Sequence, residues 1–251
     1  MIVDGTIQQI WSYIIQRWDG VVSHWLFPAV VGYVVLVTLA IYFTLKDIGP
    51  FKSARINQNP LPDAKYMFRV ASFQCISYAA GIIIFWIAIP HHVELPPTVP
   101  TLSEFFLDLS ISLVIGDFLY FLQHILHHKI PFLWKKVHYV HHRFKRDVFC
   151  WAVGWAHPFE MILGLLAVFV YPCAIRPIHP LSMWVYVSIF FGLLVEEHSN
   201  HDVWWSPGHW VPAIFGGAVP HGVHHAKIRG NYGFLFAFWD KAFGTYIPPC
   251  E

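Results

Sequence analysis

Long stretches without a charged side chain are the feature that most limits what this chain can fold into. Residues 24–45 contain no Asp, Glu, Lys or Arg, and residues 70–90 form a second uncharged stretch of similar length. About 20 apolar residues in a helix span the hydrocarbon core of a bilayer, where every backbone polar group must be paired within the segment. Residues 105–126 form a third stretch, interrupted by two aspartates. The sequence therefore predicts an all-α, polytopic membrane bundle.

Two shorter apolar segments, residues 159–175 and 181–196, follow later in the chain. Each is marginal as a span, so we expect a helical hairpin that dips into or just crosses the bilayer, for about four to five membrane segments in all. Only 12% of the residues are charged, against about 25% in soluble domains. The net charge of +1 gives no reason to expect nucleic-acid binding.

The N-terminal residues 1–23 show a different pattern. Ile7, Ile10, Trp11 and Ile14 recur at helical spacing, and polar residues fill most of the other face. This predicts an amphipathic helix that either lies on a membrane surface or packs on its own protein. Residues 24–251 are then expected to form a single membrane domain.

Basic residues alternate between the loops. Segments 46–69 and 129–146 are rich in Lys and Arg, whereas segment 91–104 has none. The positive-inside rule places the basic loops in the cytosol. We therefore expect a cytosolic cap made of residues 127–158 and 197–251, with the N-terminus on the opposite side of the membrane.

Three copies of the motif His-x-x-His-His lie in this predicted cap. Residues at i, i+3 and i+4 share one face of a helix, so each copy can aim its imidazoles into a common space. Nine histidines exceed what one ion binds but suit two. The sequence therefore predicts a dinuclear metal centre. The copies are His124, His127 and His128; His138, His141 and His142; and His221, His224 and His225.

The ligand type alone does not name the metal, because imidazole suits iron, copper, zinc and nickel. Two non-enzymatic readings also stay open. A metal transporter could line its path with histidines, although it would place them near the middle of the bilayer. A haem-binding membrane protein could use paired histidines as axial ligands, and its visible spectrum would identify it.

Several other polar residues are candidates for the site. Asp117 lies seven residues before His124 on the same helix face, and a charge within the hydrocarbon costs about 2.5–3.5 kcal/mol, which usually marks a function. We expect its carboxylate to accept the second N–H of a ligand histidine, with a snorkelling or helix–helix contact as the alternative. Glu197 is assigned the same supporting role. His198 and His201 follow it, and each is either a metal ligand or part of the polar end of a membrane hairpin.

Extended motifs add a resemblance to a known family. The order D-x6-H-x2-HH, HxxHH, EEHS, HxxHH and WDKAFGTY resembles the fatty acid hydroxylase and sterol desaturase superfamily of membrane-bound, non-haem di-iron oxygenases. HILHHKIPFLW and VEEHS are most similar to its cholesterol 25-hydroxylase branch. WAHPFE, which contains His157, is weakly similar to 4-methylsterol oxidases.

The resemblance implies two iron ions per chain, with zinc as a substitute in preparations. Three further histidines are less certain ligands: His127, His157 and His201. Asn200-His201 replaces a usual Gly-Tyr, and Pro220 stands where many members have histidine, which leaves the substrate open. The implied metal ligands are His124, His128, His138, His141, His142, His198, His221, His224 and His225.

The implied activity is hydroxylation of an unactivated C–H bond of a lipid, with O2 and external electrons. The expected substrate is a sterol, and desaturation, 4-methylsterol oxidation or fatty acid hydroxylation by the same centre is the alternative. No GxGxxG motif is present, so a cytochrome b5-like or other electron donor is expected to dock on the cytosolic face near Lys135, Lys136 and residues 143–146. The chain would occupy the endoplasmic reticulum membrane of a eukaryote or the inner membrane of a bacterium.

Overall fold

The computed structural model describes residues 2–49, 55–145, 148–170, 174 and 176–249. Parts of some predicted segments therefore lie outside the described residues. These are residue 1 of the N-terminal helix, residues 50–54 of the basic segment 46–69, residues 146–147 of the basic segment 129–146 and of the cap, residues 171–173 and 175 of the fourth membrane segment, and residues 250–251 of the cap.

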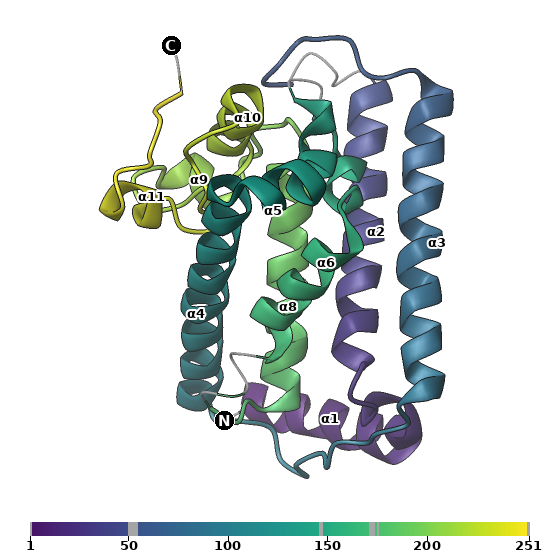
Figure 1. The fold of residues 1–251 in the computed structure, drawn as a ribbon. Coiled ribbons are helices and arrows are strands. Elements are labelled where there is room, and N and C mark those ends of the chain that lie inside the picture. The colour runs from purple at the N-terminus through teal and green to yellow at the C-terminus, as the bar shows by residue number, and fades with distance from the viewer. Residues whose placement is uncertain (1, 50–54, 146–147, 171–173, 175, 250–251) are drawn as a thin grey trace.

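Four long helices form the body of the molecule (Figure 1). They are α2 (Phe27–Ile48), α3 (Ala64–Ala88), α4 (Leu102–Lys129) and α8 (Pro180–Glu197), and each is long and apolar enough to cross a membrane. The predictions of an all-α bundle and of an integral membrane protein are confirmed to this extent. The described residues contain isolated β-bridges and no extended strand.

The fourth predicted membrane segment, residues 159–175, forms a shorter helix than the others over its described residues. It consists of α6 (Pro158–Leu165), which continues into the π-helical turn η4 (Leu166–Val170). This helix is apolar but lacks the length of the four long ones. Gln123 on α4 donates from its side-chain amide to the Glu160 carbonyl oxygen, and α6 thereby lies beside α4.

The core includes the interface between α2 and α8, which approach each other closely at glycines. A Cβ added to Gly32 would come within 2.6 Å of the Phe191 ring, and one added to Gly192 would come within 3.3 Å of Leu39. Glycines allow such close approach of helices in membranes. A capping box of Thr101 and Glu104 begins α4, each residue bonding the other's backbone N–H.

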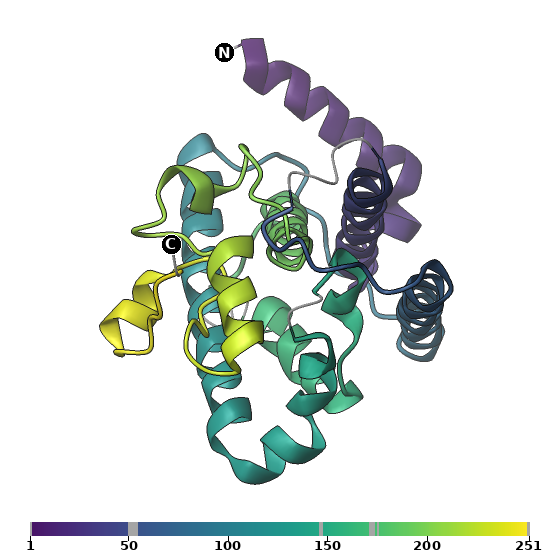
Figure 2. The ribbon, with the colours of Figure 1, turned by 90° about the horizontal axis from the view of Figure 1, so that it is seen from above.

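The two ends of the bundle differ (Figures 1 and 2). At one end, α1 (Ile2–Val22) lies across the long helices, with Trp11 buried and donating to the Pro96 carbonyl, and with Ile10 and Trp18 exposed. The histidines of the three motifs lie at the other end. The elements there are α5 (Pro131–Lys136), η2 (His138–Phe144), η3 (Cys150–Gly154), α9 (Pro207–Trp210), α10 (Ala218–Lys227) and α11 (Phe238–Ala242).

Candidate metal centre

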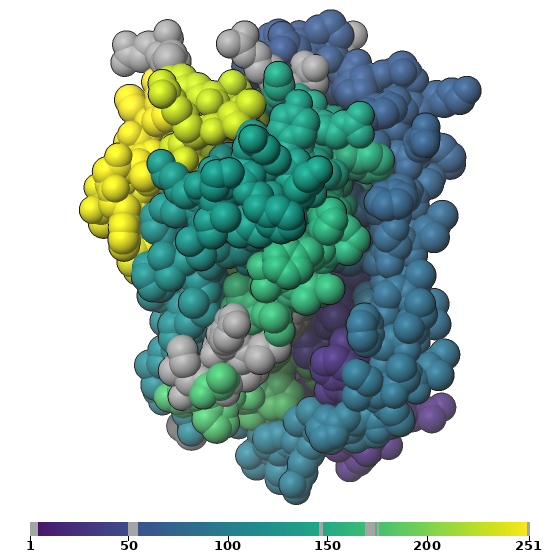
Figure 3. All heavy atoms as spheres, in the orientation of Figure 1, coloured from purple at the N-terminus to yellow at the C-terminus, as the bar shows by residue number. Residues whose placement is uncertain are grey.

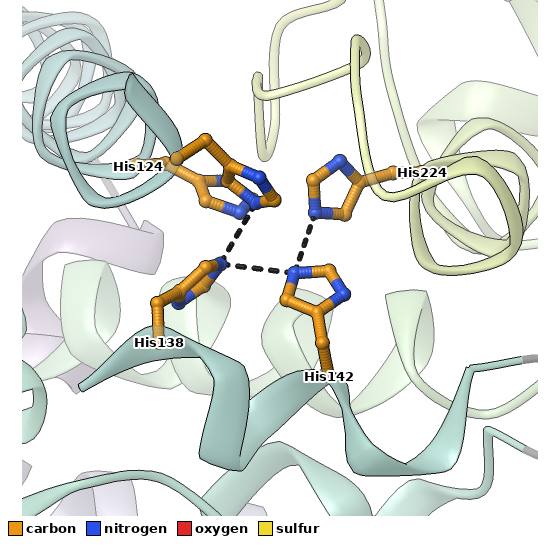
Figure 4. Close-up of side chains that lie close together, drawn as sticks. His124, His138, His142 and His224 are labelled. Atoms are coloured by element: carbon orange, nitrogen blue, oxygen red, sulfur yellow. Dashed lines mark hydrogen bonds between the residues drawn. The ribbon is translucent and has the colours of Figure 1, made fainter. Parts of the chain in front are cut away.

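The histidines converge in two clusters rather than in three. In each cluster the ligand atoms, one per residue, lie within 4.8 Å of one another. Figure 4 shows four rings of the first cluster pointing toward a common centre. The first cluster is His124, His128, His138, His142 and His224; the second cluster is His141, His198, His221 and His225.

Two of the three sequence motifs are divided between the clusters. The second motif forms the 3₁₀-helix η2 instead of an α-helical face, and His141 points to the second cluster while its two partners join the first. The helix α10 is divided in the same way, because His224 lies in the first cluster and His221 and His225 in the second. The prediction that each motif aims into one space is therefore corrected: η2 and α10 each serve both clusters.

The rings of the first cluster are oriented by partners outside it. His124 donates from Nδ1 to the Tyr232 carbonyl at 2.9 Å, and His224 donates from Nδ1 to the Gly230 carbonyl at 2.7 Å. His138 donates from Nδ1 to the Glu160 carboxylate at 2.6 Å. A neutral imidazole that donates from Nδ1 keeps its lone pair on Nε2. Three Nε2 lone pairs thus point into one small space.

A metal ion fits this arrangement. The Nε2 atom of His138 lies 2.9 Å from those of both His128 and His142, and the Nε2 atoms of His142 and His224 are 3.1 Å apart. Two nitrogens bound to one ion at about 2.1 Å lie about 3.0–3.4 Å apart for bond angles of about 90–110°. The Nε2 atom of His124 is buried and has no hydrogen-bond partner among the described residues. A cation at the centre would satisfy these lone pairs together.

The second cluster has fewer fixed rings and a carboxylate beside it. His198 donates from Nδ1 to the Leu194 carbonyl, and its Nε2 lies 3.2 Å from that of His141 and 3.1 Å from that of His221. Glu197 is 2% exposed, and its two oxygens lie 3.5 Å from Nδ1 of His198 and of His221. Glu197 therefore lies beside two histidines of the second cluster, and its supporting role at a metal site stays a prediction.

Burial keeps these imidazoles neutral, as metal ligands must be. Removal from water lowers the pKa of His141 to about 4 and that of His224 to about 3. Burial also lowers the pKa of four others well below the ordinary value of 6.5, and repulsion between neighbouring imidazolium charges adds to the effect. These four are His142, His198, His221 and His225.

Asp117 supports the site differently from the expected way. Its carboxylate accepts hydrogen bonds from the Leu235 and Phe236 backbone N–H groups and from the Trp239 indole, rather than from a cluster histidine. It fastens the C-terminal segment to α4. Asp240 completes this attachment by accepting from the Tyr232 N–H at 2.8 Å, and the Tyr232 carbonyl is the acceptor for His124.

Sequence reasoning missed the partners that orient the rings. The sequence assigns no role at the metal site to Glu160, Tyr232, Gly230 or Asp240. The WAHPFE and WDKAFGTY motifs contained a signal for Glu160 and Asp240, but the two carbonyl acceptors have none. Glu196 is a further support: it accepts from the Ala218 N–H at the start of α10, which follows Gly217 with a φ of +114°.

The three less certain ligands lie outside both clusters. His157 caps the start of α6 by accepting the Phe159 N–H. His201 is buried against Asp47, with Nε2 3.0 Å from the carboxylate. His127 donates from Nδ1 to the Gln123 carbonyl of its own helix.

A cavity of about 90 Å³ lies beside both clusters. Its polar wall includes His124 of the first cluster and His141 and His198 of the second. The rest of its wall is mostly apolar and comes from α3, α4, α6, α8 and the segment after η3. A small molecule in this cavity would lie next to both candidate metal positions.

Comparison with known proteins agrees with this geometry. A protein 29% identical over 252 residues, covering 95% of this chain and 97% of the relative, is the "Cholesterol 25-hydroxylase-like protein" of Danio rerio. The cholesterol 25-hydroxylase of Mus musculus is 27% identical, covering 95% of this chain and 82% of the relative. A methylsterol monooxygenase of Aspergillus fumigatus is 28% identical, covering 83% of this chain and 72% of the relative.

No solved structure matches the chain. The family model described as fatty acid hydroxylase matches residues 109–245, which contain all nine histidines of the two clusters and more than half of the chain. Together with the four long apolar helices and the two histidine clusters, this match shows that the chain belongs to the fatty acid hydroxylase family of oxidoreductases.

Proposed function

We propose that the chain is a membrane-bound non-haem di-iron oxygenase that hydroxylates an unactivated C–H bond of a sterol, with O2 and external electrons. The observation that carries this proposal is the pair of neutral histidine clusters next to one cavity. The names of the relatives, which include cholesterol 25-hydroxylases and a methylsterol monooxygenase, support the substrate class.

In this proposal each cluster holds one iron ion, so that all nine cluster histidines are ligands. Iron supplies the change of oxidation state that O2 chemistry needs, which zinc cannot supply. The protein's own contribution is orientation: Glu160 and the Tyr232 and Gly230 carbonyls fix three rings of the first cluster. The apolar wall of the cavity holds the reacting end of the lipid and excludes water from it.

The remaining parts of the reaction lie outside the chain. The histidine end of the bundle faces the cytosol, in accordance with the basic loops there. A cytochrome b5-like donor delivers electrons to this face, where Lys135, Lys136 and Arg143 are exposed; Arg146 lies outside the described residues. The substrate comes from the bilayer, and in a eukaryotic cell that bilayer is the endoplasmic reticulum membrane.

A second candidate uses the same centre for 4-methylsterol oxidation, and the methylsterol monooxygenase among the relatives favours it over fatty acid hydroxylation or desaturation. The mass of the product distinguishes these reactions. Hydroxylation adds one oxygen, whereas desaturation removes two hydrogens.

The first test is the metal content of detergent-purified protein, with a visible spectrum of the same sample. About two tightly bound iron ions per chain and no Soret band are expected. Incubation with a sterol, O2 and a reducing system should then give a product heavier by one oxygen. A haem spectrum, or no tightly bound metal after growth with ample iron, would contradict the proposal.

A further inference from the structure

The cavity beside the clusters is too small to enclose a whole lipid. Its volume of about 90 Å³ is well below the roughly 300 Å³ of pockets that bury a drug-sized ligand. It can hold the reacting end of a lipid, and the rest of the molecule must pass through one of its walls. The position of that passage decides which lipids fit.

The helix α6 forms the wall between the cavity and the outside of the bundle. Met161, Gly164 and Leu165 line the cavity, while Phe159 and Ile162 on the same helix are 46% and 55% exposed. Figures 1 and 3 show α6 on the outer face of the molecule. Exposed apolar side chains on a membrane helix face lipid, so only one helix separates the cavity from the bilayer.

Gly164 lies in this wall without a local reason for being glycine. Glycine within a helix is less favourable than alanine. Neither a positive φ nor close packing requires it here, because an added Cβ would meet nothing within 4 Å. Gly116 and Gly154 differ, since a Cβ there would collide with Tyr186 and Gln74 respectively. What Gly164 provides is open space in the wall of the cavity.

The geometry points to Gly164 as the residue that sets the width of a lateral passage from the bilayer to the metal centre, and therefore the bulk of the lipid that is accepted. This inference rests on the proposed oxygenase function, because it assigns that function's substrate its route. Gly164→Leu would add side-chain atoms to the wall of the cavity, and its Cβ would meet nothing within 4 Å. Tyr78 of α3 also lines the cavity.

The test compares Gly164→Leu with Gly81→Leu. Gly81 is a suitable control because it lies within α3, an added Cβ there meets nothing within 4 Å, and it does not line the cavity. We expect Gly164→Leu to lower kcat/KM toward a sterol by about tenfold or more, with Gly164→Ala intermediate. Gly81→Leu should retain wild-type kinetics, and metal content should be the same in all the variants.

A binding measurement separates this inference from the proposed function. A photoreactive sterol bearing a diazirine should label the wild type and Gly81→Leu, and label Gly164→Leu weakly. Equal labelling of all the variants, or no specific labelling of the wild type, would overturn the role of Gly164. Labelling that depends on Gly164 without any oxidised product would instead support the passage and contradict the oxygenase.

Discussion

The two histidine clusters differ in how their imidazole rings are held in position. In the first, three rings donate from Nδ1 to Glu160 or to a backbone carbonyl of segment 230–232. In the second, His198 alone has such a hydrogen bond among those described, and the buried carboxylate of Glu197 lies 3.5 Å from this ring and from His221. Both nitrogens of His225 are buried without a hydrogen-bond partner among the described residues. The first cluster is thus organised before an ion binds, whereas the second depends more on the ion itself.

This difference predicts that the first cluster binds its ion more tightly. Preorganised ligands lose less freedom on binding, and partners outside the ligand shell typically change metal affinity by about 10- to 100-fold. Stepwise removal of metal with a chelator should therefore release one ion well before the other. Release of both ions in a single step would contradict the comparison.

The largest effects on metal content and activity are expected from removal of a proposed ligand in either cluster. His138→Ala removes a ring whose Nε2 contacts two others of the first cluster, and His225→Ala removes one from the second. Each variant should retain about one ion instead of two and lose at least about 100-fold in oxygenase activity, since a ligand matters more than its supporting partner. Elemental analysis and product assays measure both quantities.

His209→Ala is the control for these variants. His209 is partly exposed and paired with Asp202, outside both clusters. It should retain both ions and full activity. A His138→Ala protein with two tightly bound ions would show that His138 is not a ligand.

The next largest effect, on metal affinity, is expected from changes to the two carboxylates beside the clusters, those of Glu160 and Glu197. Glu160→Gln weakens a 2.6 Å hydrogen bond to a ring of the first cluster, whereas Glu197→Gln changes contacts of 3.5 Å in the second. We expect Glu160→Gln to lower the affinity for the first ion by about 10- to 100-fold, and Glu197→Gln to affect the second ion less. Chelator competition measures both affinities.

Asp202→Asn is the matched control for loss of a carboxylate, because Asp202 is exposed and bonds only His209 among the contacts described. It should leave both affinities unchanged. If Glu197→Gln weakened metal binding more than Glu160→Gln, the long contacts of Glu197 would outweigh the short bond of Glu160, and the comparison between the clusters would be reversed.

A smaller and more indirect effect is expected at Asp240. Asp240→Asn weakens its hydrogen bonds to the Tyr232 and Gly233 N–H groups and to Thr245. Hydrogen bonds to a buried charge contribute about 1.5–3 kcal/mol, so the thermal midpoint should fall measurably. Because Tyr232 orients His124, the first ion should also be lost more readily, and the second should not.

Asp63→Asn provides the comparison for Asp240→Asn. Asp63 caps α3 at an exposed position, where asparagine serves equally well. The thermal midpoint of Asp63→Asn should stay close to that of the wild type. Equal loss of both ions from Asp240→Asn would indicate general loosening of the cap instead of a specific effect on the first cluster.

The residues that orient the histidine rings are also the part of the site that the sequence could not predict. The four long helices follow from length and from the absence of charge, which are local properties. The convergence of nine histidines follows from repetition of one motif. Their division into clusters does not, because it depends on how η2 and α10 are oriented between the two clusters in the folded chain.

Distance along the chain hid the remaining contacts. Glu160 lies 22 residues from His138, and Leu235 lies 118 residues from Asp117. A carbonyl acceptor such as that of Gly230 has no side-chain signature at all. Asp117 shows the consequence: its position on the face of His124 was evident, yet its carboxylate bonds a segment that only the folded chain brings near.

The smallest effect on metal binding is expected at His201, which the sequence left as an uncertain ligand. It is buried, but its Nε2 contacts Asp47, which also pairs with Arg55 at 3.3 Å. His201→Gln should therefore retain both ions while it lowers the free energy of unfolding by about 1–3 kcal/mol, because a hydrogen bond to a buried carboxylate is weakened. Asp47→Asn should destabilise more, since it leaves the buried Arg55 without its counter-charge. Metal analysis and thermal unfolding of both variants distinguish a structural role of His201 from a role as a metal ligand. Loss of about one ion from His201→Gln would add His201 to the second cluster. It would also remove the contrast between a first cluster whose rings have many partners and a second cluster whose rings have few.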